Sequence, residues 1–479
     1  MIRAKSFLAL ALAATALAGC NLAPRYVRPT GAVPPTLPND GIYPSAQSDA
    51  PDVSEIGWRD FFTDTRLQQV IAQGIDNNRD LRIAAANVLQ ARAQYRVQRA
   101  DRLPTVTASG GVTFTNNAGN AGGAGQAGAV TGGSGGGDVE IYSAQVGLSA
   151  FEIDLFGRVR NLSRAALEQY FATEEARRAM RISLIAEIAN AWLTLAADQE
   201  RLQLARETLK TFEETRKLTQ ERFRIGIASE LEARQADTNY QAARNDIAVL
   251  QTQTAQDRNA LDLLVGAPVA AELLPTDFGE GFATLQTLPA DVSSAVLLGR
   301  PDVLQAEHQL IAENANIGAA RAALFPTISL TAIGSTVSSA LSGLFNDGSF
   351  SYTASPDVSL PIFDSGRRIA NVRYAEAAQQ AAVANYERAI QTAFREVADA
   401  LALRGTIDEQ IAAQSARAES ALVASRLSDA RFRVGVDSFL VALDAQRTAY
   451  AAQQQLVTTR FSRATNLVEL YRSLGGGLK

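Results

Sequence analysis

The feature that most limits how this chain can fold is a long segment without proline or glycine. From Arg158 to about Arg222 neither residue occurs, and Ala, Leu, Arg, Glu and Gln dominate, which predicts a nearly unbroken helix. Roughly 65 residues at about 1.5 Å each span about 95 to 100 Å. A globular core has no need of such a rod, so we expect a mainly helical protein built on long hairpins.

Apolar residues in this segment recur at the seven-residue spacing of coiled coils. They include Ile188, Leu195, Leu202 and Leu209. The spacing continues in the following segment, so the two helices can pack as an antiparallel pair. We expect one hairpin of helices 157–222 and 229–266 around Gly226, and a second of helices 366–431 and 437–474 around Gly435.

The second hairpin is expected because the sequence contains one pattern twice. The motif Arg222-Phe223-Arg224-Ile225-Gly226 recurs as Arg431-Phe432-Arg433-Val434-Gly435, and the same offset carries Gly157-Arg158 onto Gly366-Arg367 and Gly266 onto Gly475. Upstream, at a slightly larger offset, Arg99 to Thr105 matches Arg321 to Thr327. The two offsets differ because the first copy contains extra residues, which we assign to a flexible loop rich in Gly, Ala, Ser and Thr at 116–137. We therefore expect a first repeat at 58–270, a linker at 271–289, a second repeat at 290–475 and a tail at 476–479.

Each repeat also holds two segments in which polar and apolar residues alternate, which predicts four strands at about 104–115, 140–152, 326–337 and 350–361. Their length and pattern suit tilted strands of an outer membrane barrel, although a soluble sheet covered by helices has a similar pattern. A sheet in lipid cannot leave an edge unpaired, and four strands are too few to close. Apolar strand faces therefore imply an oligomer, with eight strands from two chains or twelve from three.

The N-terminus resembles a bacterial lipoprotein signal. Arg3 and Lys5 precede an apolar run that ends in Leu17-Ala18-Gly19-Cys20, so we expect a signal peptide at 1–19 and lipid on Cys20. A single cysteine is otherwise most often a small buried apolar residue. Asn21 after the cysteine favours delivery to the outer membrane. Residues 20–57 would then form an acylated extended segment.

The composition gives little support for chemistry or nucleic acid binding. The formal charge is −5, and no compensating basic tract remains once the signal peptide is removed, so nucleic acid is not an expected partner. The one histidine, His308, lacks cysteine companions for a metal site. The loop 116–137 lacks the Lys-Ser/Thr ending of a phosphate-binding loop. We expect no enzyme activity, no metal and no cofactor besides the lipid on Cys20.

Several motifs together resemble the TolC-like outer membrane factors, in particular the lipoprotein branch typified by OprM that serves resistance-nodulation-division efflux pumps. The resemblance covers nearly the whole mature chain. The motifs are Asp154-Leu155-Phe156-Gly157-Arg158, Arg300-Pro301-Asp302-Val303, Arg431-Phe432-Arg433-Val434-Gly435-Val436-Asp437, Leu443-Asp444-Ala445-Gln446-Arg447 and Leu474-Gly475-Gly476-Gly477.

This resemblance implies a homotrimer with a twelve-stranded β-barrel in outer-membrane lipid and a periplasmic α-barrel of long helical hairpins. It further implies docking with a periplasmic adaptor protein and an inner-membrane transporter. The implied function is a passive exit duct for small molecules in a tripartite efflux pump, with a periplasmic gate that opens on docking.

Carried over by position, Leu440 and Asp444 would form the gate. Arg431, Phe432, Asp437 and Arg447 would brace neighbouring helices. Phe432 stands where family members often have tyrosine, so a hydroxyl that could bond across helices is missing, and we expect the closed state to be held more loosely.

The residues near Gly435 suit a gate on physical grounds too. Leu440, Asp444 and Arg447 are four and three residues apart, so they share one helical face, and a ring of carboxylates in a narrow pore favours cations. The alternative is an exposed pair of Asp444 and Arg447 worth at most about 0.5 kcal/mol. For the whole chain, the alternatives to a duct are a lipid-tethered periplasmic coiled-coil scaffold without a pore and a lipoprotein enzyme.

Overall fold

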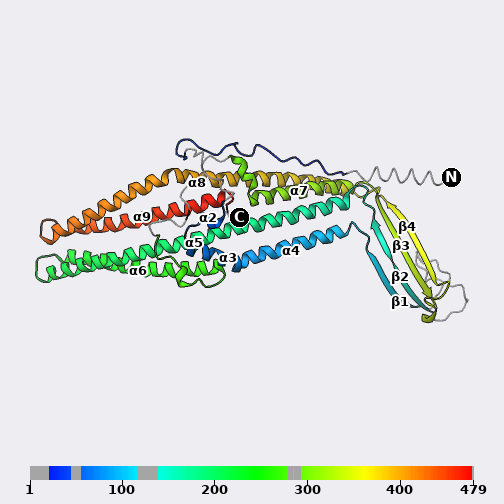
Figure 1. The fold of residues 1–479 in the computed structure, drawn as a ribbon, viewed down its shortest axis with the longest axis horizontal. Coiled ribbons are helices and arrows are strands. Elements are labelled where there is room, and N and C mark those ends of the chain that lie inside the picture. Colours follow the sequence, from blue (N-terminus) through cyan, green and yellow to red (C-terminus); the bar gives the residue numbers. More distant parts are fainter. Residues whose placement is uncertain (1–20, 45–55, 116–138, 279–283, 285–292, 477–479) are drawn as a thin grey trace. The chain divides into compact units, whose positions relative to one another are not determined.

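The computed structural model describes residues 21–44, 56–115, 139–278, 284 and 293–476. The expected signal peptide, Cys20 and the loop 116–137 lie outside these residues. Within them the chain is mainly helical and carries one four-stranded antiparallel sheet, which confirms the fold class expected from the sequence (Figure 1).

Both copies contain a helix, two strands and two long helices in the same order, and in the first copy α2 and α3 precede them. The first copy contains α2 (Trp58–Phe61), α3 (Thr65–Asn77), α4 (Arg79–Ala100), β1 (Val106–Thr115), β2 (Val139–Glu152), α5 (Arg158–Arg224) and α6 (Glu230–Val265). The second contains α7 (Pro301–Ala322), β3 (Thr327–Ser338), β4 (Phe350–Ser359), α8 (Arg367–Arg433) and α9 (Phe439–Ser473). The long helices α5 and α8 each have 67 residues, so these two equivalent helices match in length.

The chain divides into two compact units, and each takes segments from both copies. The first unit holds the sheet and the helix ends next to it, in segments 1–28, 88–173 and 306–386. The second holds the remaining helices, in segments 29–87, 174–305 and 387–479. The units therefore cut across the sequence repeat.

The glycines that recur between the copies all have a left-handed backbone. Each has a φ between +77° and +82°, a conformation that side chains with a Cβ rarely adopt. They lie where a helix begins after a strand (Gly157 and Gly366), at the hairpin turns (Gly226 and Gly435) and at the ends of α6 and α9 (Gly266 and Gly475). The turns between elements thus explain why the repeat remains visible in the sequence.

Equivalent residues also join the helices end to end in both copies. The Asn78 side chain, just before α4, donates from Nδ2 to the carbonyl of Leu264 at the end of α6 over 2.7 Å. Its counterpart Arg300, just before α7, donates from Nη1 to the carbonyl of Ser473 at the end of α9, also over 2.7 Å. Each bond occupies a backbone carbonyl that the helix end leaves without an internal partner.

Arg300 is almost fully buried, and its charge is balanced by two carboxylates. Its Nη2 lies 2.7 Å from Asp302 and 2.8 Å from Glu396 of α8. Burial alone lowers the pKa of a guanidinium, but the hydrogen bonds to these carboxylates outweigh burial and raise the pKa of Arg300. The motif Arg300-Pro301-Asp302 therefore begins α7 and fastens it to α8 and α9.

The seam of α5 packs as the seven-residue spacing predicts. Ile188, Leu195 and Leu202 are buried, and Trp192 beside them donates from Nε1 to the carbonyl of Leu273 over 3.0 Å. By composition alone one window of α5 could span a membrane, but 56% of that window is buried in the protein. Helix packing therefore accounts for its apolar character.

The sheet has the strand order β1-β2-β3-β4 and two chemically different faces. Ala108, Val146, Gly334 and Tyr352 lie side by side on the apolar face. On the polar face, Gln145 donates to Ser109 and the hydroxyls of Ser335 and Ser351 are 2.9 Å apart. Across the polar face, Ser109 lies opposite Gln145, Gln145 opposite Ser335, and Ser335 opposite Ser351.

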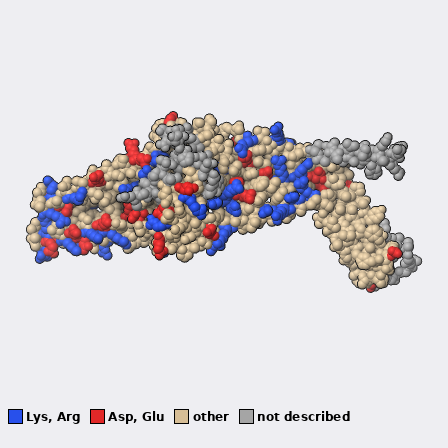
Figure 2. Space-filling view, in the orientation of Figure 1, with Lys and Arg blue, Asp and Glu red and all other residues tan. Residues whose placement is uncertain are grey.

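Both faces of the outer strands β1 and β4 are exposed along nearly their whole length. The visible surface of the sheet is almost free of charged side chains, whereas the helices carry many of both signs (Figure 2). No strand of the described chain pairs with the outer edge of β1 or of β4. A soluble sheet covered by the chain's own helices does not fit these observations.

Candidate functional site

The candidate gate residues lie beside the two hairpin turns of the second unit, and the turns share one backbone design. In the α5–α6 turn, Gly226 N–H donates to Phe223 over 2.9 Å and Ile227 N–H donates to Arg222 over 2.8 Å. In the α8–α9 turn, Gly435 N–H donates to the carbonyl of Phe432 over 3.0 Å, and Val436 N–H donates to the carbonyl of Arg431 over 2.9 Å. Glycine at the left-handed position lets each long helix end and reverse within a few residues.

The side chains make the two turns different. Arg431 donates through Nε and Nη2 to both carboxylate oxygens of Asp437, over 2.7 and 2.8 Å. The hydrogen bond from Arg431 holds the pKa of Asp437 below its ordinary value, and Asp437 raises the pKa of Arg431. In this chain the two residues therefore fasten their own turn. The α5–α6 turn lacks this ion pair, because the first copy has Ala228 where the second has Asp437.

Phe432 connects the two hairpins. Its side chain is 6% exposed and packs with Phe439, Ala236, Ala442 and Leu443, with Leu218 of α5 against the same cluster. The guanidinium of Arg222, at the other turn, lies 4.7 Å from the centre of the Phe432 ring. A cation over an aromatic face is attractive, so phenylalanine makes an interhelical contact here without a hydroxyl.

The face of α9 that carries Leu440, Asp444 and Arg447 points away from this packing. All three side chains are exposed, and Leu440 keeps 61% of its surface in solvent. Among the described residues, Asp444 and Arg447 form no ion pair with each other or with any other side chain. An exposed leucine beside an unpaired carboxylate, both next to the turn that Arg431 and Asp437 close, is a surface open to further contacts.

Both copies of the repeat match one family model. The model describes the outer membrane efflux protein family, and it matches residues 70–267 and 292–476. The chain belongs to the outer membrane efflux protein family.

Similarity to individual proteins extends over nearly the full length. The chain is 44% identical to the probable efflux pump outer membrane protein TtgC of Pseudomonas putida, over 99% of this chain and 96% of that protein. It is 39% identical to the cation efflux system protein CusC of Escherichia coli, over 97% of this chain and 97% of that one.

Solved structures agree in fold. A crystal structure of CusC matches with a TM-score of 0.83 and 38% identity, covering 96% of this chain and all of that one. The open state of the Neisseria gonorrhoeae MtrE outer membrane channel matches with a TM-score of 0.83 and 37% identity, covering 96% and 99%. This efflux protein is an outer membrane component of an efflux pump and serves as its exit duct.

Buried polar contacts between the helices of this efflux protein did not emerge from the sequence. Gln446 of α9 donates from Nε2 to the hydroxyl of Thr215 in α5 over 3.1 Å, and both side chains are buried. Tyr450, one turn further along α9, donates to Asp246 of α6 over 3.2 Å. The available signal was a polar residue, Gln446, in line with the apolar positions of the α9 seam.

A third polar contact joins the same three helices and involves two carboxylates. Arg201 of α5 lies 2.6 Å from Asp198 and donates to the hydroxyl of Thr458 in α9 over 3.0 Å. Burial, and next the neighbouring charge of Asp198, raise the pKa of Asp257 in α6 to about 6, while Arg201 opposes the shift. Above about pH 6, Asp257 therefore adds a negative charge next to the ion pair of Arg201 and Asp198.

We expect Asp257→Asn to stabilise the efflux protein at pH 7.5, by about 1 kcal/mol once partial exposure is allowed for. Because the pKa of Asp257 is raised on folding, the native protein binds more protons than the unfolded chain between its ordinary pKa and about 6. Lowering the pH from 7.5 to 5 should therefore raise the thermal unfolding midpoint of the unmodified protein, and the advantage of Asp257→Asn should shrink. The control is Asp399→Asn, whose carboxylate on α8 is 76% exposed. A gain that does not change with pH would contradict this assignment.

Proposed function

We propose that three copies of this efflux protein join into one duct, in which β4 of each copy pairs with β1 of the next to form a twelve-stranded barrel. Cargo would pass through it passively, delivered by an inner-membrane transporter through a periplasmic adaptor protein. The observation that carries the proposal is the sheet itself, whose two outer edges lack a strand partner among the described residues and whose apolar face is exposed.

The number three follows from the size of the barrel. In lipid, every backbone N–H and C=O must find a partner, so the edges of β1 and β4 have to be paired. Two copies would supply eight strands, and side chains fill the interior of a barrel of that size. Three copies give twelve strands and leave a lumen between the polar faces, on which Ser109, Gln145 and Ser335 lie.

Threefold closure would also turn single exposed side chains into rings. We place Leu440 as an apolar ring and Asp444 as a ring of negative charge at the periplasmic end of the tunnel, with Arg447 on the same face of α9. The exposure of these residues and the hydrogen-bonded turn beside them support this placement. Arg431 and Asp437 would set the direction of the turn, Phe432 would hold the two hairpins together, and docking of the adaptor would open the gate.

We further propose that lipid on Cys20 anchors the chain at the level where the strands end. The residues that follow Cys20 support this position, because Asn161, in the first turn of α5 just beyond β2, donates to the Asn21 side chain over 2.9 Å. Asn314 of α7 then donates to the Pro24 carbonyl over 2.7 Å, and Arg28 lies 2.6 Å from Glu307. The acyl chains would add membrane affinity to a protein whose barrel already enters the lipid.

The two alternative functions, a coiled-coil scaffold and an enzyme, can each be distinguished from a duct. A lipid-tethered coiled-coil scaffold needs no pore, so conductance through purified trimers separates it from a duct. For an enzyme, the natural candidate is His308, whose Nδ1 lies 2.8 Å from Glu168 and whose ring is 5.4 Å from that of Phe171. These contacts suit a packed structural histidine, and we propose that the chain performs no chemistry of its own.

The barrel should tolerate charge on one face of β4 only. Val358 lies on the apolar face and is 63% exposed, whereas Thr353 lies on the opposite face. In the proposed barrel, Val358→Arg places a charge in lipid at a cost of up to about 2 to 4 kcal/mol, whereas Thr353→Arg enters the aqueous lumen. We expect Val358→Arg to reduce the yield of outer-membrane trimers on unheated gels and Thr353→Arg to leave it near normal. Equal tolerance of both variants would contradict the barrel.

The gate residues should act in two distinguishable ways in single-channel recordings. Leu440→Ala combined with Asp444→Ala removes bulk and charge from the proposed constriction, so unitary conductance should rise and cation selectivity should fall. Arg431→Ala or Asp437→Ala loosens a turn without changing the pore lining, so opening should become more frequent at unchanged conductance. The control is Arg224→Ala at the end of α5, beside the other turn, where the one ion pair of Arg224 within the described residues is with exposed Glu221. Unchanged conductance, selectivity and opening frequency in all these variants would contradict the assignment of these residues to a gate.

A further inference from the structure

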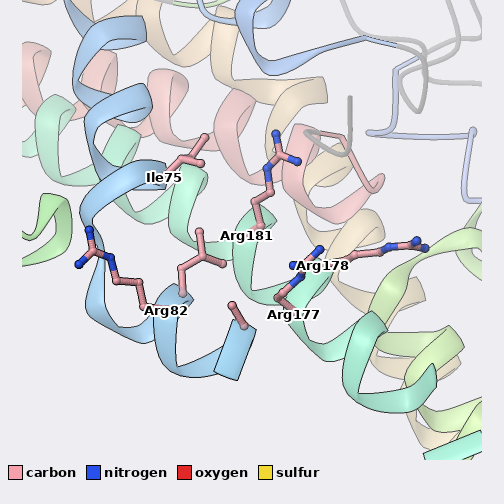
Figure 3. Close-up of a pocket in the computed structure, with 7 residues that line it drawn as sticks. Ile75, Arg82, Arg177, Arg178 and Arg181 are labelled. Atoms are coloured by element: carbon pink, nitrogen blue, oxygen red, sulfur yellow. The ribbon is translucent and has the colours of Figure 1, made fainter. Parts of the chain in front are cut away.

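A pocket rich in arginine lies between α3, α4 and α5 in the second unit. It has a volume of about 590 Å³. Ile75, Leu81 and Ala85 give it an apolar wall, and its remaining lining residues are Arg82, Arg177, Arg178 and Arg181. Arg82 comes from α4 and the other three arginines from α5, and their guanidinium groups are spread around the pocket without meeting at one point (Figure 3).

Most of this positive charge has no carboxylate partner in the described part of the chain. Arg178 is paired, with Nη1 2.7 Å from Glu175. Within the described residues, the guanidinium of Arg82 donates only to the backbone carbonyl of Asp76, over 3.1 Å. Neither Arg177 nor Arg181 forms an ion pair with a described residue, and the Nε of Arg181 is buried without a hydrogen-bond partner. Guanidinium groups stay protonated in proteins, so the pocket remains positive at any working pH.

Such an arrangement is unfavourable unless something balances it. Arg177 and Arg181 are one helical turn apart, where like charges repel, and a buried N–H without an acceptor carries a desolvation cost. Two other half-buried arginines further along the same helix do have carboxylate partners, since Arg201 pairs with Asp198 and Arg216 with Asp237. The buried Nε of Arg181 without a hydrogen-bond partner therefore sets this pocket apart from them.

We propose that the arginine pocket binds a small anion that carries at least two phosphate-type charges. Guanidinium forks match phosphate oxygens in geometry and charge, and groups spread around a pocket suit an anion whose charges are also separated. The wall of Ile75, Leu81 and Ala85 suits an organic remainder on the ligand. A soluble phosphate ester and a phospholipid headgroup share this chemistry. The site is separate from the duct's gate and does not depend on its assignment.

The first experiment uses the full-length purified trimer in detergent and inorganic pyrophosphate as the probe. At constant ionic strength, pyrophosphate should raise the thermal unfolding midpoint, because a ligand that binds only the folded state stabilises it. Calorimetric titration should give one site per chain. Arg177→Gln combined with Arg181→Gln should weaken binding by at least roughly tenfold, since charge-assisted hydrogen bonds are lost. Arg206→Gln, an exposed arginine on the same helix, should bind like the unmodified protein.

A second set of titrations identifies the natural source, with short-chain cardiolipin, whose headgroup carries two separated phosphates, and with short-chain phosphatidylcholine, which has no net charge. Competition with pyrophosphate by cardiolipin alone indicates a lipid headgroup, and no competition by either lipid indicates a soluble phosphate ester. Absence of pyrophosphate binding, or equal binding by the Arg177→Gln/Arg181→Gln variant, would overturn the proposal. Dissociation of that variant into monomers would also overturn it, because the arginines would then serve a contact between subunits. Arg177→Lys with Arg181→Lys keeps the charge and tests the fork geometry if the glutamine variant does not fold.

Discussion

The need to pair the backbone of the two outer strands governs the rest of this molecule. Four strands with an exposed apolar face and two free edges are stable in lipid only when another strand meets each edge. Because the chain supplies four strands, the proposed barrel must come from several copies, and the helices that leave the strands are then arranged around the same axis. A gate made from one exposed leucine and one exposed carboxylate per chain makes sense only in such an assembly.

Duplication provides the framework of the chain, and the two copies differ in the side chains near their turns. The turn glycines Gly226 and Gly435 share a φ of +81°, and Asn78 and Arg300 perform the same end-to-end joining in their own copies. The side chains near the turns have diverged. The second copy fastens its turn with Arg431 and Asp437, whereas Arg222 of the first copy reaches across to Phe432. The candidate gate lies on the hairpin with the fastened turn.

Periodicity and local chemistry were enough to predict the elements, because both act over short stretches of chain. The seam of Ile188 and Leu195, the alternating strands and the turn glycines all follow from spacing and backbone preference alone. Contacts between distant segments were not predictable in this way. The Gln446 bond to Thr215, the carboxylates around Arg201 and the arginine pocket depend on which helix faces are brought together. Arg431 could have bonded many carboxylates, and only the folded turn selects Asp437.

Cross-linking of the two sheet edges tests the central claim of threefold closure most directly. The chain has one natural cysteine, Cys20, so a cysteine can be added to β1 by Thr107→Cys and to β4 by Ser355→Cys with little background. A flexible bis-maleimide applied to outer membranes should then link neighbouring copies into a ladder that ends at three chains, and only when both cysteines are present. A ladder that ends at two chains, continues beyond three or never forms would contradict the account.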